Sequence, residues 1–403
     1  MGAPNDHRSD HLIDPPSGWK PNWLTSDLSL AIIEALGRDK VCFVGGAVRD
    51  SLRGLPVSDL DMATSHTPDV MQRRLNEASI KTIPTGLKHG TVTAVRDGLS
   101  CEITTLRRDL ETDGRHAAVE FTDDWQDDAE RRDFTINALY VTPDGRIFDP
   151  VGGMADLRKQ KVRFIGDAEQ RIREDALRIL RFYRFSARFA EHIDEAGQAA
   201  CKKCIEMIDG LSIERIRDEF LKIFALSDIM PTITLMQKSR VLHRIFGSDW
   251  RPGSIEAYCA NEARLNAPIN PLVRLYLLPG DQLSAVETAT KFKLSNNDRE
   301  FFRSVEAASR QTSFDTEQDI RRSFYEFGKP ATSAAHIILG GANYALVERL
   351  AREWTLPVFP VKGRDLIAQG ATAGPKLGGM LAQLEKNWVD SDFSLTKSQL
   401  IAM

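Results

Sequence analysis

The chain has 403 residues, enough for two to four domains, and a composition of 42% hydrophobic and 27% charged residues that excludes a disordered or fibrous protein. Its net charge of −4 does not by itself indicate a protein that binds nucleic acid. No apolar run reaches the ~18 residues of a membrane helix. Five cysteines without framework spacing favour a reducing compartment, so we predict a cytoplasmic protein without membrane contact.

The amino-terminal segment, residues 1–21, is polar and rich in proline, and we predict that it is a flexible tail. Thr25-Ser26-Asp27 then offers an N-cap for a helix that runs to Leu36. Residues 22–150 alternate short strands with helices, which predicts a small α/β head. Past Gly153 the pattern indicates helices alone, so the expected fold class is α+β.

The most informative stretch joins Gly45-Gly46-Ala47-Val48-Arg49-Asp50 to Asp59-Leu60-Asp61. Val41–Val44 before it predicts a buried strand, and the glycines follow where the backbone turns and can approach a ligand. The next strand is predicted to carry Asp59 and Asp61 on one face, because side chains two apart on a strand point the same way. An isolated Asp-x-Asp is usually a solvated pair. Here the glycine turn upstream favours a site for Mg²⁺, which prefers oxygen ligands.

Three further polar features of the head each admit two interpretations. Glu102, on the second of two β-rich runs, is either a third acid of the metal site or an exposed strand residue. Arg107–His116 is polar and contains a glycine, which predicts a mobile loop. Glu130 is expected to open a helix through Ala138. On that helix Arg132 either clamps a triphosphate bidentately or is a surface charge.

The positive charge of the chain is concentrated locally. Between Arg158 and Arg188 there are ten Lys or Arg residues against four Asp or Glu residues, an excess of 10 − 4 = 6. A solvated helix face and a nucleic-acid contact both account for this excess. Nearby, Cys201-x-x-Cys204 has no second pair, so we predict two half-buried thiols rather than a zinc site.

The stretch Glu174–Phe185 is predicted to form one helix on which Asp175 and Arg178 are neighbours at i,i+3. As a surface ion pair they would contribute only about 0.2–1 kcal/mol. Alternatively, the carboxylate accepts from an exocyclic amine while the guanidinium donates to a ring nitrogen, which is the pattern that cytosine and adenine require. Uracil and guanine carry a carbonyl at that position and would be rejected.

Taken in order, these motifs resemble those of the class II CCA-adding tRNA nucleotidyltransferases, a family shared with bacterial poly(A) polymerases. The resemblance is specific over residues 41–190 and looser beyond. The stretches that carry it are GGAVRD with DLD, EITTLR from Glu102, TDGRHA from Thr112, ERRDFTINAL from Glu130, DP from Asp149 with GGMADL, and EDALRILR from Glu174. It implies an enzyme that uses Mg²⁺ to add C, C and A to the tRNA 3′ end from CTP and ATP, without a nucleic-acid template and with release of pyrophosphate.

The resemblance also implies an architecture and a role for each site residue. A polymerase-β-like head at 22–150 would be followed by a helical neck at 151–210, a body at 211–335 and a tRNA-binding tail at 336–403. The motif Ser212–Phe224 resembles the helix that supports the neck. Asp59 and Asp61 would hold the metal, with Glu102 as the further catalytic acid. The nucleotide-binding residues would be Gly46, Arg49, Arg132, Asp175, Arg178, Arg181 and Arg184.

Three functions remain open on the sequence: CCA addition, poly(A) polymerisation, and a non-catalytic RNA-binding module. The stretch 107–121 looks more like the CCA-adding form, and the sequence shows no long basic C-terminal extension, which favours CCA addition. The intact acids and the Asp175/Arg178 pair disfavour a decayed site. No obligate protein partner is evident.

Overall fold

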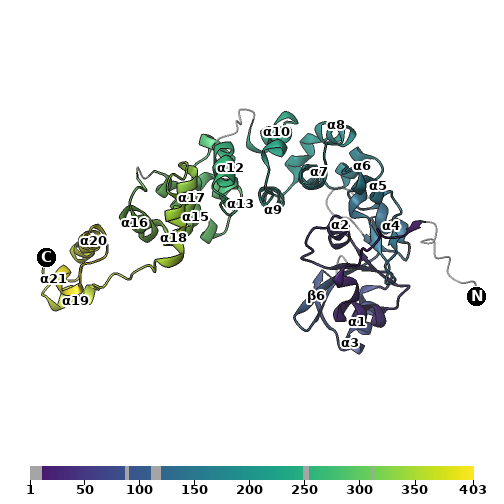
Figure 1. Ribbon diagram of the computed structural model, residues 1–403, viewed down its shortest axis with the longest axis horizontal. Coiled ribbons are helices and arrows are strands. Elements are labelled where there is room, and N and C mark those ends of the chain that lie inside the picture. The colour runs from purple at the N-terminus through teal and green to yellow at the C-terminus, as the bar shows by residue number, and fades with distance from the viewer. Residues whose placement is uncertain (1–10, 87–89, 110–118, 248–253, 311–312) are drawn as a thin grey trace, which may run out of the picture. The chain divides into compact units, whose positions relative to one another are not determined.

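The computed structural model describes residues 11–86, 90–109, 119–247, 254–310 and 313–403 (Figure 1). The chain divides into two compact units, the first formed by Met1–Glu219 with Pro231–Gly247 and the second by Phe220–Met230 with Ser248–Met403. Within the described ranges, no helix is both long and apolar enough to cross a membrane. The finer division into head, neck, body and tail stays a prediction.

The first unit contains a sheet with the strand order β1-β10-β9-β2-β3-β6-β5-β4 and a separate ribbon of β7 with β8. Its pairs are antiparallel except for the parallel pair of β3 with β6. The strands are β1 (Leu12–Ile13), β2 (Val41–Val44), β3 (Asp61–Thr64), β4 (Lys81–Gly86), β5 (Thr91–Arg96), β6 (Leu99–Thr105), β7 (Arg107–Asp109), β8 (Val119–Phe121), β9 (Tyr140–Val141) and β10 (Ile147–Phe148).

Helices follow and surround these strands; α1 and α3, for example, lie side by side (Figure 1). The α1 N-cap is Ser26, whose hydroxyl accepts from the Ser29 amide, as predicted. The helices are α1 (Asp27–Leu36), α2 (Gly46–Leu52), α3 (Pro68–Glu77), α4 (Trp125–Glu130), α5 (Gly153–Arg158), α6 (Ala168–Glu174), α7 (Leu177–Phe189), α8 (Glu195–Lys203), α9 (Ile213–Phe224), α10 (Met230–Lys238) and α11 (Val241–Phe246), with 3₁₀ turns η2 (Asn22–Thr25), η4 (Thr135–Asn137) and η5 (Ile205–Gly210).

The described residues of the second unit form helices and connecting segments without a strand. Arg274, which is 2% exposed, pairs with the equally buried Glu262 and donates to the carbonyl of Phe224, so it caps the end of α9. Its helices are α12 (Ile255–Arg264), α13 (Pro271–Leu277), α14 (Ala285–Lys291), α15 (Asn296–Ser309), α16 (Glu317–Phe327), α17 (Lys329–Ile338), α18 (Tyr344–Glu353), α19 (Gly363–Ala368), α20 (Pro375–Asp390) and α21 (Lys397–Ile401), with the 3₁₀ turn η6 (Gly280–Gln282).

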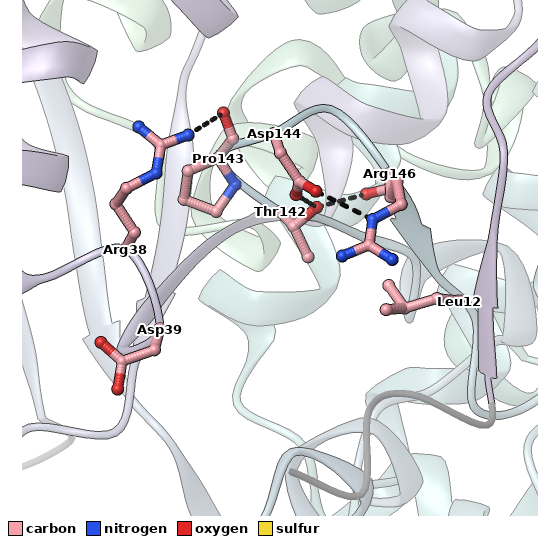
Figure 2. Close-up of a pocket in the computed structure, with 7 residues that line it drawn as sticks. All are labelled: Leu12, Arg38, Asp39, Thr142, Pro143, Asp144 and Arg146. Atoms are coloured by element: carbon pink, nitrogen blue, oxygen red, sulfur yellow. Dashed lines mark hydrogen bonds and ion pairs between the residues drawn. The ribbon is translucent and has the colours of Figure 1, made fainter.

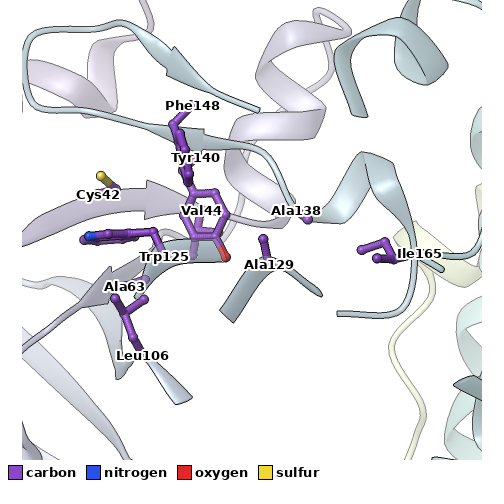
Figure 3. Packing of buried hydrophobic residues seen from close by; sticks show 10 residues of the cluster. All are labelled: Cys42, Val44, Ala63, Leu106, Trp125, Ala129, Ala138, Tyr140, Phe148 and Ile165. Carbon is purple, nitrogen blue, oxygen red and sulfur yellow. The ribbon is translucent and has the colours of Figure 1, made fainter. Parts of the chain in front are cut away.

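The order of strands explains where the site forms. In β2, Phe43 pairs with Met62 of β3, so the Gly45 turn that follows β2 lies beside Asp61 at the start of β3. All of β2 is buried, and the core beneath it includes Val44, Trp125 and Tyr140 (Figure 3). The sheet therefore holds the glycine turn and the acid together at one edge.

Several local predictions for the head need correction. Leu12–Ile13, expected in the tail, pair with β10, and Arg107–Asp109, expected in a mobile loop, pair with β8. Asp59 precedes β3, although the Glu102 amide donates to the Leu60 carbonyl just beyond the ladder. The rest of the predicted loop, residues 110–116, lies outside the described residues.

Two predicted helices also differ. The expected helix from Glu130 to Ala138 is wrong: α4 ends at Glu130, and the side chain of Asp133 accepts from the Phe134 amide, which favours a turn. The expected helix through Glu174–Phe185 is broken at Asp175, whose backbone is extended and whose carboxylate accepts from the Leu177 amide.

Candidate active site

The predicted acids lie at the edge where β3 and β6 begin to pair. Asp61 pairs in parallel register with Glu102, while Asp59 is exposed just ahead of the strand. Burial, followed by the charges of Glu102 and Asp59, raises the pKa of Asp61 to about 6, although Arg132 acts in the opposite direction. This edge therefore carries an excess of negative charge.

The donor set at this edge fits Mg²⁺. The cation takes carboxylate oxygens and retains water or phosphate oxygens in its other positions, so Asp59 and Asp61 suffice as protein ligands. Within the described residues, no group of three or more His, Cys, Asp or Glu side chains is placed to hold a metal. The charge of Glu102 acts on Asp61, and its role as a third acid of the metal site stays a prediction.

Gly45 allows the turn to approach these acids. Its φ of 76° lies in the left-handed region that glycine adopts without strain. A Cβ built there would lie 3.7 Å from Asp61 Oδ2 and 3.9 Å from Arg132 Nη1. Both distances are ordinary van der Waals contacts, so the left-handed backbone rather than crowding favours glycine here, and the turn lies next to both Asp61 and Arg132. Gly46, which begins α2, approaches Arg49 in the same way, since its Cβ would lie 3.8 Å from Arg49 Nη2.

Four arginines gather around two phenylalanine rings of α7, and we call this group the arginine cluster. The guanidinium of Arg184 lies 4.3 Å from the Phe185 ring centre and that of Arg181 lies 5.3 Å from it. The Arg49 guanidinium lies 5.1 Å from the Phe185 ring and 4.3 Å from Phe189. The fourth member is Arg188, over Phe189. The cluster brings together three of the predicted residues, Arg49, Arg181 and Arg184.

Each arginine of the cluster has an acidic partner. Arg49 and Arg188 both donate to Asp50, and Arg181 donates to Asp133 at 2.7 Å. Arg184 donates to Glu219 of α9 at 2.6 Å. Burial, assisted by the neighbouring cations Arg188 and Arg184, lowers the pKa of Arg49. Four arginines thus share three carboxylates, so most of the positive charge in the cluster is paired and one positive charge remains in excess.

The two predicted base-reading residues do not pair with each other. Asp175 accepts both of its ion-pair hydrogen bonds from Arg215 of α9, at 3.0 and 2.8 Å. Arg178 is 9% exposed and donates to Glu174 at 2.6 Å and to the carbonyl of Arg131 at 3.0 Å. Arg178 therefore also caps the end of α4, just before Arg132.

Sequence reasoning missed the acids that hold the arginines. Asp133 and Asn137 stood in a quoted motif without a role, yet Asp133 binds Arg181, and the amide oxygen of Asn137 accepts from Arg49. Asp128 on α4 and Arg132 just past its end are spaced i,i+4, a spacing that was available in the sequence as a signal for an ion pair. Glu219 and Arg215 had no comparable signal, because only folding brings α9 to the cluster.

A separate pocket of about 290 Å³ lies at the other end of β2 and β9 and contains none of the predicted residues (Figure 2). Arg38 donates to the Pro143 carbonyl there, and Arg146 donates to Asp144 at 2.8 Å. Its charges are thus already paired. The five cysteines are free, with Cys201 and Cys204 buried, more completely than predicted.

Two stretches of this chain match family models, and most of the chain is similar to known proteins. Residues 41–163 match the poly A polymerase head domain, and residues 192–250 match a probable RNA- and SrmB-binding site of polymerase A. The human mitochondrial CCA tRNA nucleotidyltransferase 1 is 33% identical over 384 residues, 89% of this chain and 85% of the relative. The CCA-adding enzyme of Lactobacillus gasseri is 31% identical over 365 residues, 85% of this chain and 87% of the relative.

Solved structures give the same picture. The Bacillus stearothermophilus CCA-adding enzyme in complex with CTP is 26% identical, with a TM-score of 0.74 over 95% of this chain and 96% of that chain. The Thermotoga maritima CCA-adding enzyme complexed with tRNA_CCA is 20% identical, with a TM-score of 0.60 over 94% and 97%, and shares the fold. The α+β class is thereby confirmed.

Proposed function

The chain belongs to the family of the CCA-adding tRNA nucleotidyltransferases, and we propose that it adds C, C and A to the 3′ end of tRNA from CTP and ATP without a nucleic-acid template. The observation that carries the proposal is the excess of negative charge around Asp61, set across the Gly45 turn from Arg132. A metal-binding edge beside a phosphate-binding arginine is the arrangement that nucleotidyl transfer requires.

The chemistry is an in-line displacement at phosphorus. The tRNA 3′-oxygen forms a bond to the α-phosphorus of CTP or ATP, the bond to the β-phosphate oxygen breaks, and pyrophosphate leaves. Mg²⁺ held by Asp59 and Asp61 would activate the hydroxyl and neutralise the triphosphate. The protein therefore needs no nucleophile of its own, and its residues act by binding and orienting the reactants.

The nucleotide-binding residues contribute in different ways. Gly46 keeps the turn free of side chains, and Arg132 presents a guanidinium edge to the phosphates. Arg181 and Arg184 complete the pocket together with Arg49, which is 5% exposed and acts chiefly through its positive field. Because each cation is held by an acid, its side chain loses little freedom when a phosphate binds.

Asp175 and Arg178 are proposed to select the base. The pair of Asp175 with Arg215 is partly exposed on both sides, so its contribution to stability is small and the carboxylate exchanges readily onto an exocyclic amine. Arg178 is held by Glu174 and two backbone carbonyls, which supports a role in fixing the helix start beside Asp175 as well as a contact with the base.

The remaining assignments are proposals of the same kind. A head at 22–150 would carry the acids, a neck at 151–210 the base-selecting residues, a body at 211–335 the support, and a tail at 336–403 the tRNA contacts. Such a protein would need tRNA, CTP, ATP and Mg²⁺ but no protein partner. A cytoplasmic location stays a prediction, which cell fractionation with CCA addition as the marker tests.

One assay tests the function. The purified protein is incubated with Mg²⁺ and a tRNA transcript that lacks CCA, with each nucleoside triphosphate alone and with CTP and ATP together. We expect two C residues with CTP alone and a completed CCA with both. Long A tails would instead indicate a poly(A) polymerase, and no extension would indicate an RNA-binding module.

A further inference from the structure

Asp128 is a buried carboxylate that none of the proposed steps uses. It lies on α4 and is 1% exposed, and a charged group so far from water is unfavourable unless its oxygens receive hydrogen bonds. Its Oδ1 accepts from Arg131 Nε and Nη2 at 2.8 and 2.6 Å. Its Oδ2 accepts from the Tyr140 hydroxyl at 2.7 Å and from Arg132.

The contact with Arg132 is directional. Arg132 Nη2 and Nε lie 3.0 and 3.3 Å from Asp128 Oδ2, and Nε also donates to the Tyr140 hydroxyl at 3.1 Å. The remaining nitrogen, Nη1, has no hydrogen-bond acceptor within the described part of the chain and is the atom that lies next to the Gly45 turn. Nε and Nη2 of the guanidinium are therefore held, while Nη1 faces the acidic edge of the sheet.

The groups that hold Arg132 are themselves fixed by the core. The Tyr140 ring is fully buried on β9, edge-on to Trp125 at 5.7 Å and tilted against Phe148 at the same centroid distance (Figure 3). Although burial alone opposes its charge, the guanidinium groups of Arg132 and Arg131 and the hydroxyl of Tyr140 keep the pKa of Asp128 well below its usual range. These contacts therefore favour the charged form of Asp128.

We propose that Asp128, assisted by the Tyr140 hydroxyl, is a positioning residue that orients the Arg132 guanidinium toward the triphosphate of the incoming nucleotide. The inference rests on the proposed function. A pre-oriented guanidinium presents its donors in the plane that phosphate oxygens require, so binding loses less side-chain freedom. Because the triphosphate is common to CTP and ATP, the contribution to binding is the same for both.

The experiment uses the full chain and four single variants. Tyr140→Phe removes one hydroxyl and keeps the ring, Asp128→Asn removes the charge, and Arg132→Ala removes the group that both act on. Asp127→Asn, on the same helix but partly exposed and paired with Thr122, is the matched control. The double variant Asp128→Asn with Arg132→Ala tests whether the two residues act as one unit.

The readouts are KM and kcat for CTP on a transcript that lacks CCA and for ATP on a transcript that ends in CC, with inhibition by inorganic tripolyphosphate. We expect KM for both nucleotides to rise about threefold in Tyr140→Phe and about tenfold in Asp128→Asn. The inhibition constant of tripolyphosphate should rise in parallel, the Asp127→Asn control should stay within about twofold, and the double variant should be no worse than Arg132→Ala. A role confined to folding would lower the active fraction without moving KM.

The results separate failure of the inference from failure of the proposed function. If Arg132→Ala raises KM for both nucleotides while folded Tyr140→Phe and Asp128→Asn leave it unchanged, Asp128 does not position Arg132 and the inference is overturned. If Arg132→Ala itself leaves KM and tripolyphosphate inhibition unchanged, the nucleotide role of Arg132 is wrong and the inference falls with it. If Asp128→Asn does not fold, the KM values of Tyr140→Phe, which preserves the packing, decide between these outcomes.

Discussion

The acidic edge and the arginine cluster of the first unit differ in how many of their charges are paired with an opposite charge. At the edge, burial and the negative charges of Glu102 and Asp59 raise the pKa of Asp61 to about 6. In the cluster, every arginine has a carboxylate within hydrogen-bonding distance, as Arg181 has Asp133. The carboxylates at the edge lack enough positive partners, whereas every arginine of the cluster has a carboxylate partner before any substrate binds, although Arg49 and Arg188 share Asp50.

The two regions are therefore suited to ligands of opposite charge. Carboxylates without a positive partner repel one another, and a bound divalent cation relieves that repulsion. The relief strengthens the binding of the metal at this edge. Arginines held by acids gain less from a phosphate but are already oriented. The edge favours strong binding of a small cation, whereas the cluster favours correct placement of a large anion.

The largest expected effect comes from removing the unbalanced charge. Asp61→Asn or Asp59→Asn should lower addition of both C and A more than about a thousandfold, because several kcal/mol of metal-ion catalysis is lost. Extension of a transcript lacking CCA measures it. Asp97→Asn, an exposed acid at the β5–β6 turn, is the control and should stay fully active. Substantial activity of Asp61→Asn with Mg²⁺ would remove it from the metal site.

Removing an acid that pairs with the arginine cluster should destabilise the protein instead. Glu219, which is 2% exposed, holds Arg184, so Glu219→Gln leaves a buried guanidinium without its counter-charge. We expect a loss of about 3 kcal/mol of unfolding free energy, measured by denaturant titration. Glu300→Gln, at a surface ion pair with Arg303, should change it by less than about 1 kcal/mol. Equal effects for the two variants would contradict the idea that the cluster needs its paired acids.

The base-selecting pair lies between the two extremes. If Asp175 reads the exocyclic amine, Asp175→Ala should narrow the preference for CTP over UTP by roughly 5- to 150-fold, the effect of about 1–3 kcal/mol for a group left unpaired. Values of kcat/KM for CTP, ATP and UTP measure it in Asp175→Ala and Arg178→Ala. An equal fall for all three nucleotides would assign the residue to support of the neck helix.

The smallest expected effect is on how the free energy of unfolding depends on pH. Because the pKa of Asp61 is raised by folding to about 6, the folded state binds its proton more tightly than the unfolded state. Its contribution is favourable below the ordinary carboxyl pKa and is lost as pH rises through 6. Without Mg²⁺, Asp61→Asn should therefore be more stable than the wild type by about 1–3 kcal/mol at pH 7, and the difference should fall below about 1 kcal/mol at pH 4. A difference that grows toward low pH would contradict this sign.

Much of the site was predictable from local patterns. The glycine turn, the alternation around Asp61 and the N-cap at Ser26 are short-range features, so the sequence alone located β2, β3 and α1 and the acids between them. The helical character beyond Gly153 was equally clear, since periodicity over long segments is the strongest signal that a sequence offers.

Tertiary structure decided the partners. Whether Arg178 faces a base or the carbonyl of Arg131 depends on where α4 ends, and α4 ends early because side chains such as Asp133 bond to the backbone that a helix would use. The hold of Glu219 on Arg184 requires α9 to pack beside α7, which no spacing along the chain encodes. The sequence by itself determined which charges exist and on which elements they lie. Only the fold determined which charges cancel, because Coulomb energy depends on distances in space that burial makes decisive.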